Sequence, residues 1–293
     1  MLKQAQVLIY LLTAMVLVQA CKSREVLVPG YVHIKAPEFT VKSDGSQGAA
    51  SEDFQDYWVF ENGLLRGNYA TPCEIPIQRN GKTPMTISVG IKRSGQEEER
   101  MIYPLVTSFK TEIDLKPNIT DTIRPSFQYL PNTVFPFMEN FDRNGVAFEY
   151  NPTYKKNGDT IIREKSPAAW DPNSFSGKVV LSEEGSILEI YSQVFKDLPR
   201  FTPVYFEMDY KNNVKFTIGV YITRSDGSVD QVPLFLAYES DGWKKLYLDL
   251  ENEISPNPTG TFYRLFIRFS NNPEAPVTNP QIYIDNLKLV HLD

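Results

Sequence analysis

The chain has 293 residues and carries 36 acidic and 30 basic side chains, which gives a formal net charge of −6 at pH 7. A mildly acidic chain without clusters of lysine and arginine argues against nucleic acid or an anionic lipid surface as its partner. Aromatic residues make up 13% of the chain and there are 21 prolines, a composition typical of many short strands joined by turns.

The first 20 residues have the form of a secretory signal. Lys3 is followed by the apolar run 7–18, which is too short for a bilayer that needs about 20 apolar residues and fits a signal core. The run from Val18 to Cys21 resembles the bacterial lipobox, which implies cleavage before Cys21 and acylation of that residue. Each buried CH₂ contributes about 0.8 kcal/mol, so several acyl chains, palmitate among them, would anchor the protein. The alternative is an ordinary secretory signal in which Cys21 is coincidental.

Residues 21–30 are then expected to form a lipidated tether. Lys22 replaces the aspartate that commonly retains such lipoproteins in the inner membrane, so the resemblance implies the outer membrane. The sequence that follows Cys21 is a poor match to the acidic export signal of the Bacteroidota, and the membrane face stays open. With Cys21 acylated, Cys73 is the one thiol left and no intrachain disulfide forms. We expect Cys73 to be a small buried residue rather than a reactive nucleophile.

Residues 31–115 read as strands joined by turns. Residues 31–41 alternate as a first strand, and the polar, glycine-rich segment 42–56 is expected to be a mobile loop. Asn62-Gly63, between two strand-like runs, is a strong hairpin signal, and Asn80-Gly81 repeats the pattern. The stretch 56–92 resembles the PEGA-type small β-sandwich, which implies a fold rather than a chemistry. The matching residues are Trp58, Val59, Phe60, Asn62, Gly63, Gly67, Pro72 and Gly81.

Residues 116–137 contain four prolines and few periodic apolar positions, which indicates an ordered connector. Asp121-Thr122-Ile123 in this connector and Asp159-Thr160-Ile161 beyond it resemble the short O-glycosylation signal of Bacteroidota periplasmic proteins. That resemblance makes Thr122 and Thr160 candidate glycosylation sites.

Residues 138–293 again show only strand-like patterns, eight or nine strands at the spacing of a sandwich. Turns are expected at Glu184-Gly185, Asn212-Asn213 and Asp226-Gly227. The closing strands resemble the galactose-binding-like jelly roll common among carbohydrate-binding modules. The predicted fold class is therefore all-β, with two β-sandwich domains of which the second is a jelly roll.

Catalytic constellations are hard to find. His33 and His291 are the two histidines of the chain, and neither lies in a nucleophile context or a zinc-ligand cluster. Paired carboxylates could serve a glycosidase, but acidic residues at alternate strand positions usually form the solvated face of a sheet. The sequence therefore predicts no enzyme and no catalytic residues.

A structural calcium ion is the one cofactor that the jelly-roll resemblance implies. Such modules often hold calcium with carboxylates of the first and last strands, and oxygen ligands suit this ion. The corresponding residues here are Glu139 or Asp142 with Asp285. The alternative is that Asp285 caps a turn or bulge at the sheet edge.

A sugar site needs an aromatic platform with polar neighbours. Trp170 lies in a predicted loop with Asp171 and Asn173 close by, near the variable binding site of the modules that the chain resembles. The alternatives are packing of Trp170 within its own loop, or docking of Trp170 onto a partner protein, since aromatic residues are enriched at interface hot spots. Trp243 is expected to pack into the core.

Two functions follow from this interpretation. The first is a non-catalytic outer-membrane lipoprotein that acts as an accessory subunit of a membrane complex, beside a transporter or an assembly barrel. The alternative is a surface lipoprotein whose jelly roll binds a polysaccharide. The sequence favours the first, because it shows neither a row of exposed tryptophans nor an acidic export signal. The fold alone does not decide between them.

Overall fold

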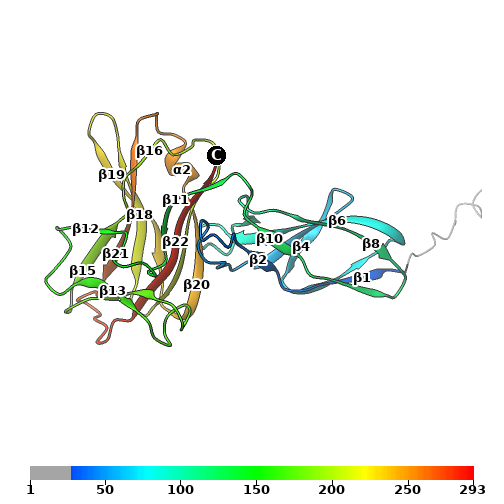
Figure 1. Ribbon diagram of the computed structural model, residues 1–293, viewed down its shortest axis with the longest axis horizontal. Coiled ribbons are helices and arrows are strands. Elements are labelled where there is room, and N and C mark those ends of the chain that lie inside the picture. The colour runs from blue at the N-terminus through cyan, green and yellow to red at the C-terminus, as the bar shows by residue number, and fades with distance from the viewer. Residues whose placement is uncertain (1–27) are drawn as a thin grey trace, which may run out of the picture.

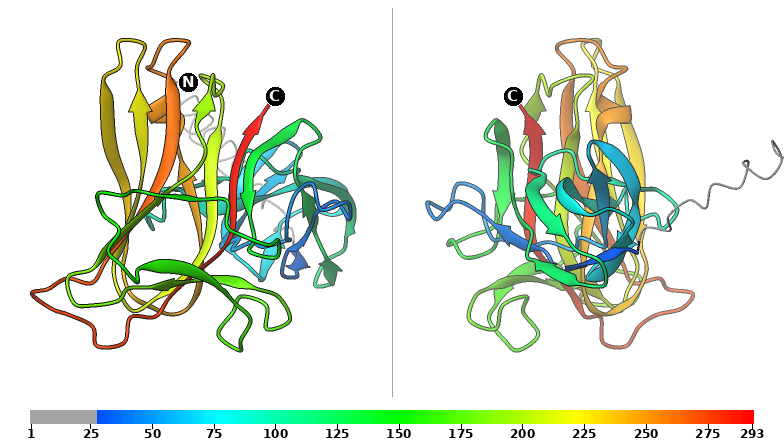
Figure 2. Two further views of the ribbon diagram at one scale, coloured as in Figure 1. Left: turned by 60° about the vertical axis from the view of Figure 1, so that its left-hand side comes forward. Right: turned by 90° about the vertical axis from the view of Figure 1, so that its right-hand side faces the viewer.

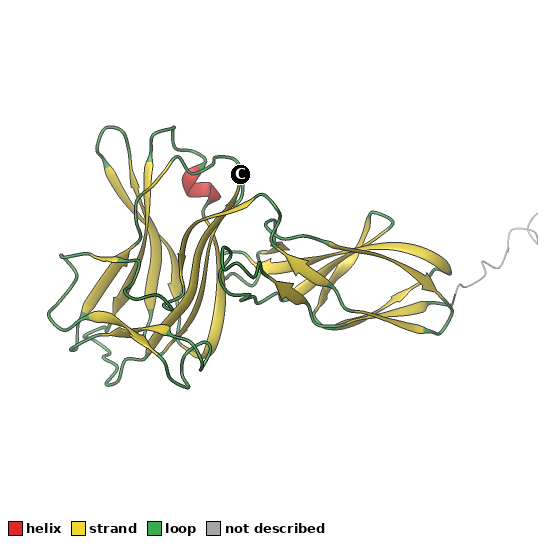
Figure 3. Ribbon diagram, viewed as in Figure 1, coloured by secondary structure: helices red, strands yellow, loops and turns green. Residues whose placement is uncertain are grey.

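The computed structural model describes residues 28–293, so Cys21 and its lipobox lie outside the described residues. The described chain forms two domains that lie end to end along the long axis of the molecule (Figure 1). Strands dominate both domains, and the helix α2 (Glu251–Ile254) is a single turn (Figure 3). The predicted all-β class with two sandwiches is confirmed. No helix in residues 28–293 is long and apolar enough to cross a membrane.

The N-terminal domain contains two short sheets that face a larger one. The larger sheet has the order β4-β3-β6-β7 with β8 beside β6, and the shorter sheets are β5-β1-β9 and β10-β2. The first half of the long strand β6 alternates in burial, because every second side chain faces the core, whereas residues 87–91 are all buried. The strands are β1 (Gly30–Ile34), β2 (Glu38–Thr40), β3 (Asp56–Glu61), β4 (Leu64–Ala70), β5 (Cys73–Ile77), β6 (Gly81–Lys92), β7 (Arg100–Ile102), β8 (Phe109–Leu115), β9 (Thr120–Ile123) and β10 (Ser126–Gln128).

The two Asn-Gly turns connect their flanking strands differently. Asn62 and Gly63 both have positive φ, 49° and 78°, and join β3 to β4 in an antiparallel hairpin as predicted. Asn80-Gly81 joins β5, which pairs with β1, to β6, which pairs with β3 and β8. The second turn therefore carries the chain from one sheet to the other instead of closing a hairpin.

The segment 116–137 is more than a connector. Its first two strands, β9 and β10, pair in parallel with β1 and β2 and so complete the N-terminal domain. Its last part belongs to β11 (Thr133–Glu139), which pairs with the final strand of the other domain. The sequence did not reveal these strands because each of the first two has only three or four residues, too few to show a period.

The C-terminal domain, the jelly roll, packs two six-stranded sheets face to face. The inner sheet has the order β13-β14-β22-β17-β20 with β11 beside β22, and the outer sheet has the order β12-β15-β21-β18-β19 with β16 beside β21. Their facing side chains form one hydrophobic core. Its remaining strands are β12 (Glu149–Tyr150), β13 (Thr160–Glu164), β14 (Ser176–Val180), β15 (Ile187–Tyr191), β16 (Phe195–Lys196), β17 (Val204–Asn212), β18 (Phe216–Thr223), β19 (Val229–Ala237), β20 (Ser240–Asp249), β21 (Phe262–Ser270) and β22 (Ile282–Leu292).

One of the three turns expected in this domain closes a hairpin, at Asp226-Gly227 between β18 and β19. The turns at Glu184-Gly185 and Asn212-Asn213 instead lead from a strand of the inner sheet to a strand of the outer sheet. A turn signature marks where the chain reverses, but it does not say whether the two flanking strands bond to each other. The long-range partners of each strand decide that.

Gly219 is needed where β18 bulges beside β19. A Cβ at this position would lie 2.5 Å from the ring of Phe266 and would also meet the carbonyl oxygen of Val232. We expect Gly219→Ala to lower the free energy of unfolding by about 1–3 kcal/mol, because the overlap displaces backbone and a buried ring. Gly242→Ala, where a Cβ would meet nothing within 4 Å, is the matched control and should stay within about 0.5 kcal/mol. Urea unfolding of both variants checks this.

The N-terminal domain covers the outward side of the inner sheet. Strands β17 and β22 are buried along nearly their whole length, and Figure 2 shows β22 (red) lying between the rest of the jelly roll and the N-terminal domain. Tyr205, Tyr247 and Val290 of the jelly roll belong to the hydrophobic core of the N-terminal domain. Tyr103 packs edge-to-face on Tyr205, with ring centroids 5.3 Å apart. The two domains therefore share a core.

Charged groups are buried at the same boundary. The carboxylate of Glu207 is fully buried and accepts hydrogen bonds from the hydroxyl groups of Tyr103 at 2.5 Å and Tyr129 at 2.9 Å. Nζ of Lys245 lies 3.2 Å from Oε2 of Glu207, and both side chains are 1% exposed. Two residues of the N-terminal domain thus hold a carboxylate of the jelly roll beside its counter-charge.

A second lysine completes this interdomain charge network. Nζ of Lys288 donates a hydrogen bond to the carbonyl of Ala49, across the boundary, at 2.7 Å. Burial lowers the pKa of Lys288 to about 8, although Glu207 opposes the shift. Burial also acts to raise the pKa of Glu207, but Lys245 and Lys288 together with its hydrogen bonds outweigh it and hold that pKa below its usual value. Glu207 is therefore ionised and needs both lysines.

Candidate functional site

The three carboxylates predicted to bind calcium are occupied by donors from the protein itself. Glu139 accepts the backbone N–H groups of Phe141 at 2.7 Å and Ala147 at 2.5 Å. Asp285 accepts the hydroxyl of Ser176 at 2.6 Å. The carboxylate of Asp142 accepts hydrogen bonds from Asn140 at 2.9 Å and from Ser174.

In residues 28–293, no three His, Cys, Asp or Glu side chains converge as a metal site. Calcium at Glu139, Asp142 and Asp285 therefore stays a prediction. These carboxylates fix the loop after β11 and the bulge of β22, because short loops need acceptors for their own N–H groups.

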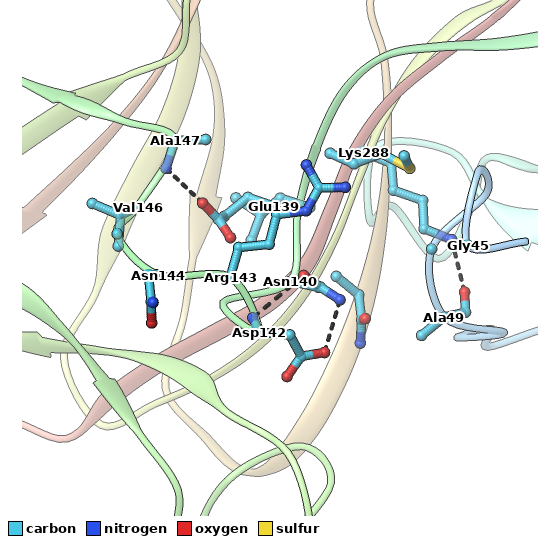
Figure 4. A pocket seen from close by; sticks show the side chains of 15 residues that line it. Gly45, Ala49, Glu139, Asn140, Asp142, Arg143, Asn144, Val146, Ala147 and Lys288 are labelled. Atoms are coloured by element: carbon cyan, nitrogen blue, oxygen red, sulfur yellow. Dashed lines mark hydrogen bonds between the residues drawn. The ribbon is translucent and has the colours of Figure 1, made fainter.

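A cleft of about 570 Å³ opens at the junction of the two domains. Figure 4 shows the loop after β11 on one side, Gly45 and Ala49 of the N-terminal domain on the other, and Lys288 reaching between them. Polar side chains line much of it, but no aromatic residue does. Its carboxylates are those held by the loop, so the cleft offers a prospective ligand few free acceptors and no ring to stack on.

Asp285, behind this cleft, makes stability depend on pH. Burial raises its pKa from 3.8 to about 7, with Asp209 and Asp142 adding to the shift, while bonds from Ser176 and Asn286 oppose it. The carboxyl group of Asp285 therefore binds its proton more tightly in the folded state than in the unfolded state. The stability that this bound proton contributes is lost as pH rises from about 4 to about 7.

We expect Asp285→Asn to remove this dependence, because the amide carries no titrating proton. Urea unfolding midpoints at pH 5 and pH 8 measure the effect. The variant should gain stability relative to the wild type at the higher pH, and an equal offset at both values would contradict the assignment.

The predicted sugar-contact loop is held by local hydrogen bonds. The backbone N–H of the half-buried Trp170 donates to Oγ of Ser176 at 2.9 Å, and the carboxylate of Asp171 accepts the N–H of Asn173 at 2.8 Å. Nε1 of Trp243 donates to the carbonyl of Ala168 at 3.2 Å. Trp243 is half-buried beside Tyr283 and is not part of the core, contrary to the expectation from the sequence. A ligand contact of Trp170, Asp171 and Asn173 stays a prediction.

The other predicted modification and thiol sites differ in accessibility. Thr122 is exposed on β9, whereas the hydroxyl of Thr160 lies 3.0 Å from that of Tyr150 and is partly buried. Glycosylation at either stays a prediction, and Thr122 is the accessible one. Cys73 is half-buried and burial raises its pKa to about 11, so its thiol is protonated near neutral pH and unsuited to act as a nucleophile.

A polar and aromatic surface lies on the solvent-facing side of the outer sheet. Side chains along β15 and β21 point alternately to this surface and into the core, and Leu188 and Leu265 are among those in the core. The register places Glu189 beside Arg268 and Arg264 beside Tyr221. We call this surface the outer-sheet face. Its residues are Glu189, Tyr191, Tyr221, Gln231, Arg264 and Arg268.

Glu189 organises the outer-sheet face. It is 0% exposed, and its carboxylate accepts hydrogen bonds from Tyr221 at 2.7 Å, Asn151 at 2.6 Å, Arg268 at 2.7 Å and Gln231 at 3.3 Å. Burial and the bond to Glu189 raise the pKa of Tyr221, so its hydroxyl stays protonated and donates. The network holds each polar side chain in one orientation without a ligand.

Aromatic rings complete the outer-sheet face. The guanidinium of Arg264 lies over the ring of Tyr191 at 4.1 Å, and that of Arg268 over Tyr154 at 4.4 Å. The rings of Tyr191 and Tyr221 meet edge-to-face with centroids 6.4 Å apart. Both tyrosines are half-buried, and the arginine side chains are 25% and 29% exposed. Ring surface and polar groups thus reach solvent together.

Sequence reasoning missed this face. The signal is present, since Arg264 and Arg268 are four residues apart and Glu189 and Tyr191 two apart, on strands whose intervening residues are apolar. Charges at alternate strand positions were interpreted as an ordinary solvated face. Only the pairing of β15, β21, β18 and β19 brings them onto one surface.

Comparison with solved structures finds proteins of low similarity. The enzymatically active domain of bacteriophage CBA120 tailspike protein 4 matches with a TM-score of 0.40 and 11% identity over 53% of this chain, which spans only 20% of the tailspike. A xylan-binding domain from Paenibacillus barcinonensis matches with a TM-score of 0.38 and 13% identity over 54% of this chain and 99% of that domain.

A carbohydrate-binding module of the β-sandwich superfamily covers more of the chain, 80% of it and 84% of the module, with a TM-score of 0.36 and 14% identity. No protein-family model and no curated protein matches the chain. At such identities and TM-scores, these resemblances assign neither a family nor a ligand to it.

Proposed function

We propose that the protein is a non-catalytic glycan-binding lipoprotein and that the outer-sheet face of its jelly roll binds the sugar. The observation that carries the proposal is the joint presentation of Tyr191 and Tyr221 with arginine and glutamine groups, which the buried Glu189 helps to orient. A sugar ring offers an apolar C–H face and an edge of hydroxyl groups. Aromatic rings suit the first, and planar hydrogen-bonding groups suit the second.

The oriented network favours binding, because it reduces the entropy lost on association. Arg268 and Gln231 are already held by Glu189, so a sugar hydroxyl meets donors whose rotamers are fixed. Arg264 is paired with the exposed carboxylate of Glu149 at 2.6 Å. Both arginines are therefore neutralised locally, which favours an uncharged polysaccharide over an acidic one.

This proposal reverses the order of the two functions suggested by the sequence. The accessory-subunit hypothesis relied on the lack of exposed tryptophans and of an acidic export signal. Half-buried tyrosines on the outer-sheet face supply an aromatic platform in place of tryptophan. Anchoring in the outer membrane through Cys21 remains part of the proposal, and it would keep the binding face near the cell envelope.

Titration of the detergent-solubilised full-length chain with a panel of neutral polysaccharides and their oligosaccharides, followed by calorimetry, tests the proposal. Saturable binding to a defined oligosaccharide is the expected result. If no glycan binds and a membrane protein co-purifies at equal abundance, the accessory-subunit function replaces it.

A further inference from the structure

The exposed apolar side chains of the N-terminal domain lie toward one end of it. Val28, Leu64, Leu65 and Ile119 are the large apolar residues of this domain with substantial exposure, at 43%, 73%, 50% and 51%. We call these four residues the distal tip. Leu64 and Leu65 follow the Asn62-Gly63 turn, Val28 lies two residues before β1, and Ile119 directly precedes β9.

Strand pairing places the distal tip away from the jelly roll. Arg93, just after β6, bridges to Tyr247 of the jelly roll, so Gly81 at the start of β6 marks the opposite end. The 12 residues of β6 separate these ends by about 40 Å at roughly 3.3 Å per residue.

The distal tip lies in the half of the N-terminal domain that contains the start of β6. Leu64 and Leu65 lie level with Met85 and Thr86, because their hairpin partners Glu61 and Phe60 pair with those residues. Gly81 pairs with Leu115, four residues before Ile119, and the N–H of Asn62 donates to the carbonyl of Pro84 at 3.0 Å. Ile119 in turn accepts a hydrogen bond from Tyr31 at its backbone oxygen, which fixes the entry of β1. Figure 1 shows the described chain entering the N-terminal domain at this same end.

The length of chain between Cys21 and Val28 indicates which surface covers the distal tip. Cys21, the predicted acylation site, lies seven residues before Val28, and seven extended residues span at most about 25 Å. A lipid on Cys21 would therefore hold the distal tip within that distance of the bilayer. Hairpin tips with exposed leucine are suited to the boundary between headgroups and acyl chains.

We propose that the distal tip docks on the lipid surface and sets the N-terminal domain upright as a spacer. The inference rests on acylation of Cys21 and is independent of the ligand of the outer-sheet face. Apolar contact supplies the attraction, so docking does not require anionic lipid, in agreement with the acidic net charge of the chain. Because the two domains share a core, the spacer fixes the distance of the jelly roll from the membrane.

Depth-dependent quenching tests this inference. The full-length chain would be produced in a bacterium that acylates lipoproteins and reconstituted into phosphatidylcholine vesicles, some containing doxyl-labelled lipid. In a Cys73→Ser background, a fluorophore would be attached at Lys116→Cys, beside the tip, or at Asp226→Cys on the jelly roll. We expect the doxyl lipid to quench the first label and not the second.

A variant with Leu64→Ser, Leu65→Ser and Ile119→Ser should lose the quenching at position 116. The acyl chains on Cys21 should still hold this variant on the vesicles. Unchanged quenching in that variant, or equal quenching of both labels, overturns the inference, as does failure of the chain to remain on vesicles. If doxyl lipid does not quench the label at position 116 but the label self-quenches at high protein density, the inference is overturned in favour of contact between two copies of the chain.

Discussion

Replacing Glu207 with alanine is expected to lower the free energy of unfolding by about 3–5 kcal/mol. The substitution removes the nearer counter-charge of Lys245, whose side chain is 1% exposed, and leaves it only Asp209 at 3.9 Å. It also leaves Lys288 buried without its main opposing charge. It also deprives the hydroxyl groups of Tyr103 and Tyr129 of their shared acceptor. Uncompensated buried charge costs more than the loss of any exposed ion pair.

Urea unfolding followed by tyrosine and tryptophan fluorescence measures the effect. Glu112→Ala is the matched control, because its carboxylate pairs with the exposed Lys82 at 3.3 Å and should change stability by less than about 0.5 kcal/mol. Glu207→Gln, which keeps an acceptor for the tyrosines, should fall between the two. If Glu207→Ala were as mild as the control, the interdomain charge network would not stabilise the junction.

Replacing Tyr191 with alanine is expected to weaken glycan affinity by about tenfold or more, equivalent to about 1.4 kcal/mol or above. The change removes a half-buried ring from the outer-sheet face and frees the guanidinium of Arg264 that lies over it at 4.1 Å. Tyr191→Phe keeps the ring and should bind nearly as well as the wild type. Calorimetric titration with the oligosaccharide that binds the wild type measures both.

Two controls locate the site. Tyr69→Ala removes a half-buried tyrosine from β4 of the N-terminal domain and should leave affinity unchanged. Trp170→Ala tests the loop favoured by the sequence. Loss of binding in Trp170→Ala with full binding in Tyr191→Ala would move the site from the outer-sheet face to that loop.

Together these results would assign glycan binding to the jelly roll and membrane docking to the N-terminal domain. The shared core around Tyr205 and Tyr247 fixes the two domains to each other, so orientation at one end is transmitted to the other. The outer-sheet face belongs to the sheet that contributes no residue to the core shared with the N-terminal domain. Docking at the distal tip would thus leave the glycan face free.

Local sequence determined the elements of this protein well. Alternating apolar residues predicted β6, in whose first half every second side chain faces the core. Apolar residues also predicted the last strands of the jelly roll, although β22 is buried on both faces. Asn62-Gly63 predicted its hairpin, since two consecutive residues with positive φ favour that turn. The all-β class and the two sandwiches follow from such patterns.

Only the tertiary structure decided which strands are neighbours, and the functional surface depends on that. The turn at Glu184-Gly185 looks like a hairpin, but β14 and β15 belong to different sheets, because distant strands compete for each edge. Glu189 and Arg268 are 79 residues apart in sequence and form a bond only through the pairing of β15 with β21. Likewise the sequence pattern around Glu207 is typical of a solvated strand residue, but the N-terminal domain covers this side chain in the structure. Burial and partnership are properties of packing between segments remote in sequence, and no local pattern encodes them.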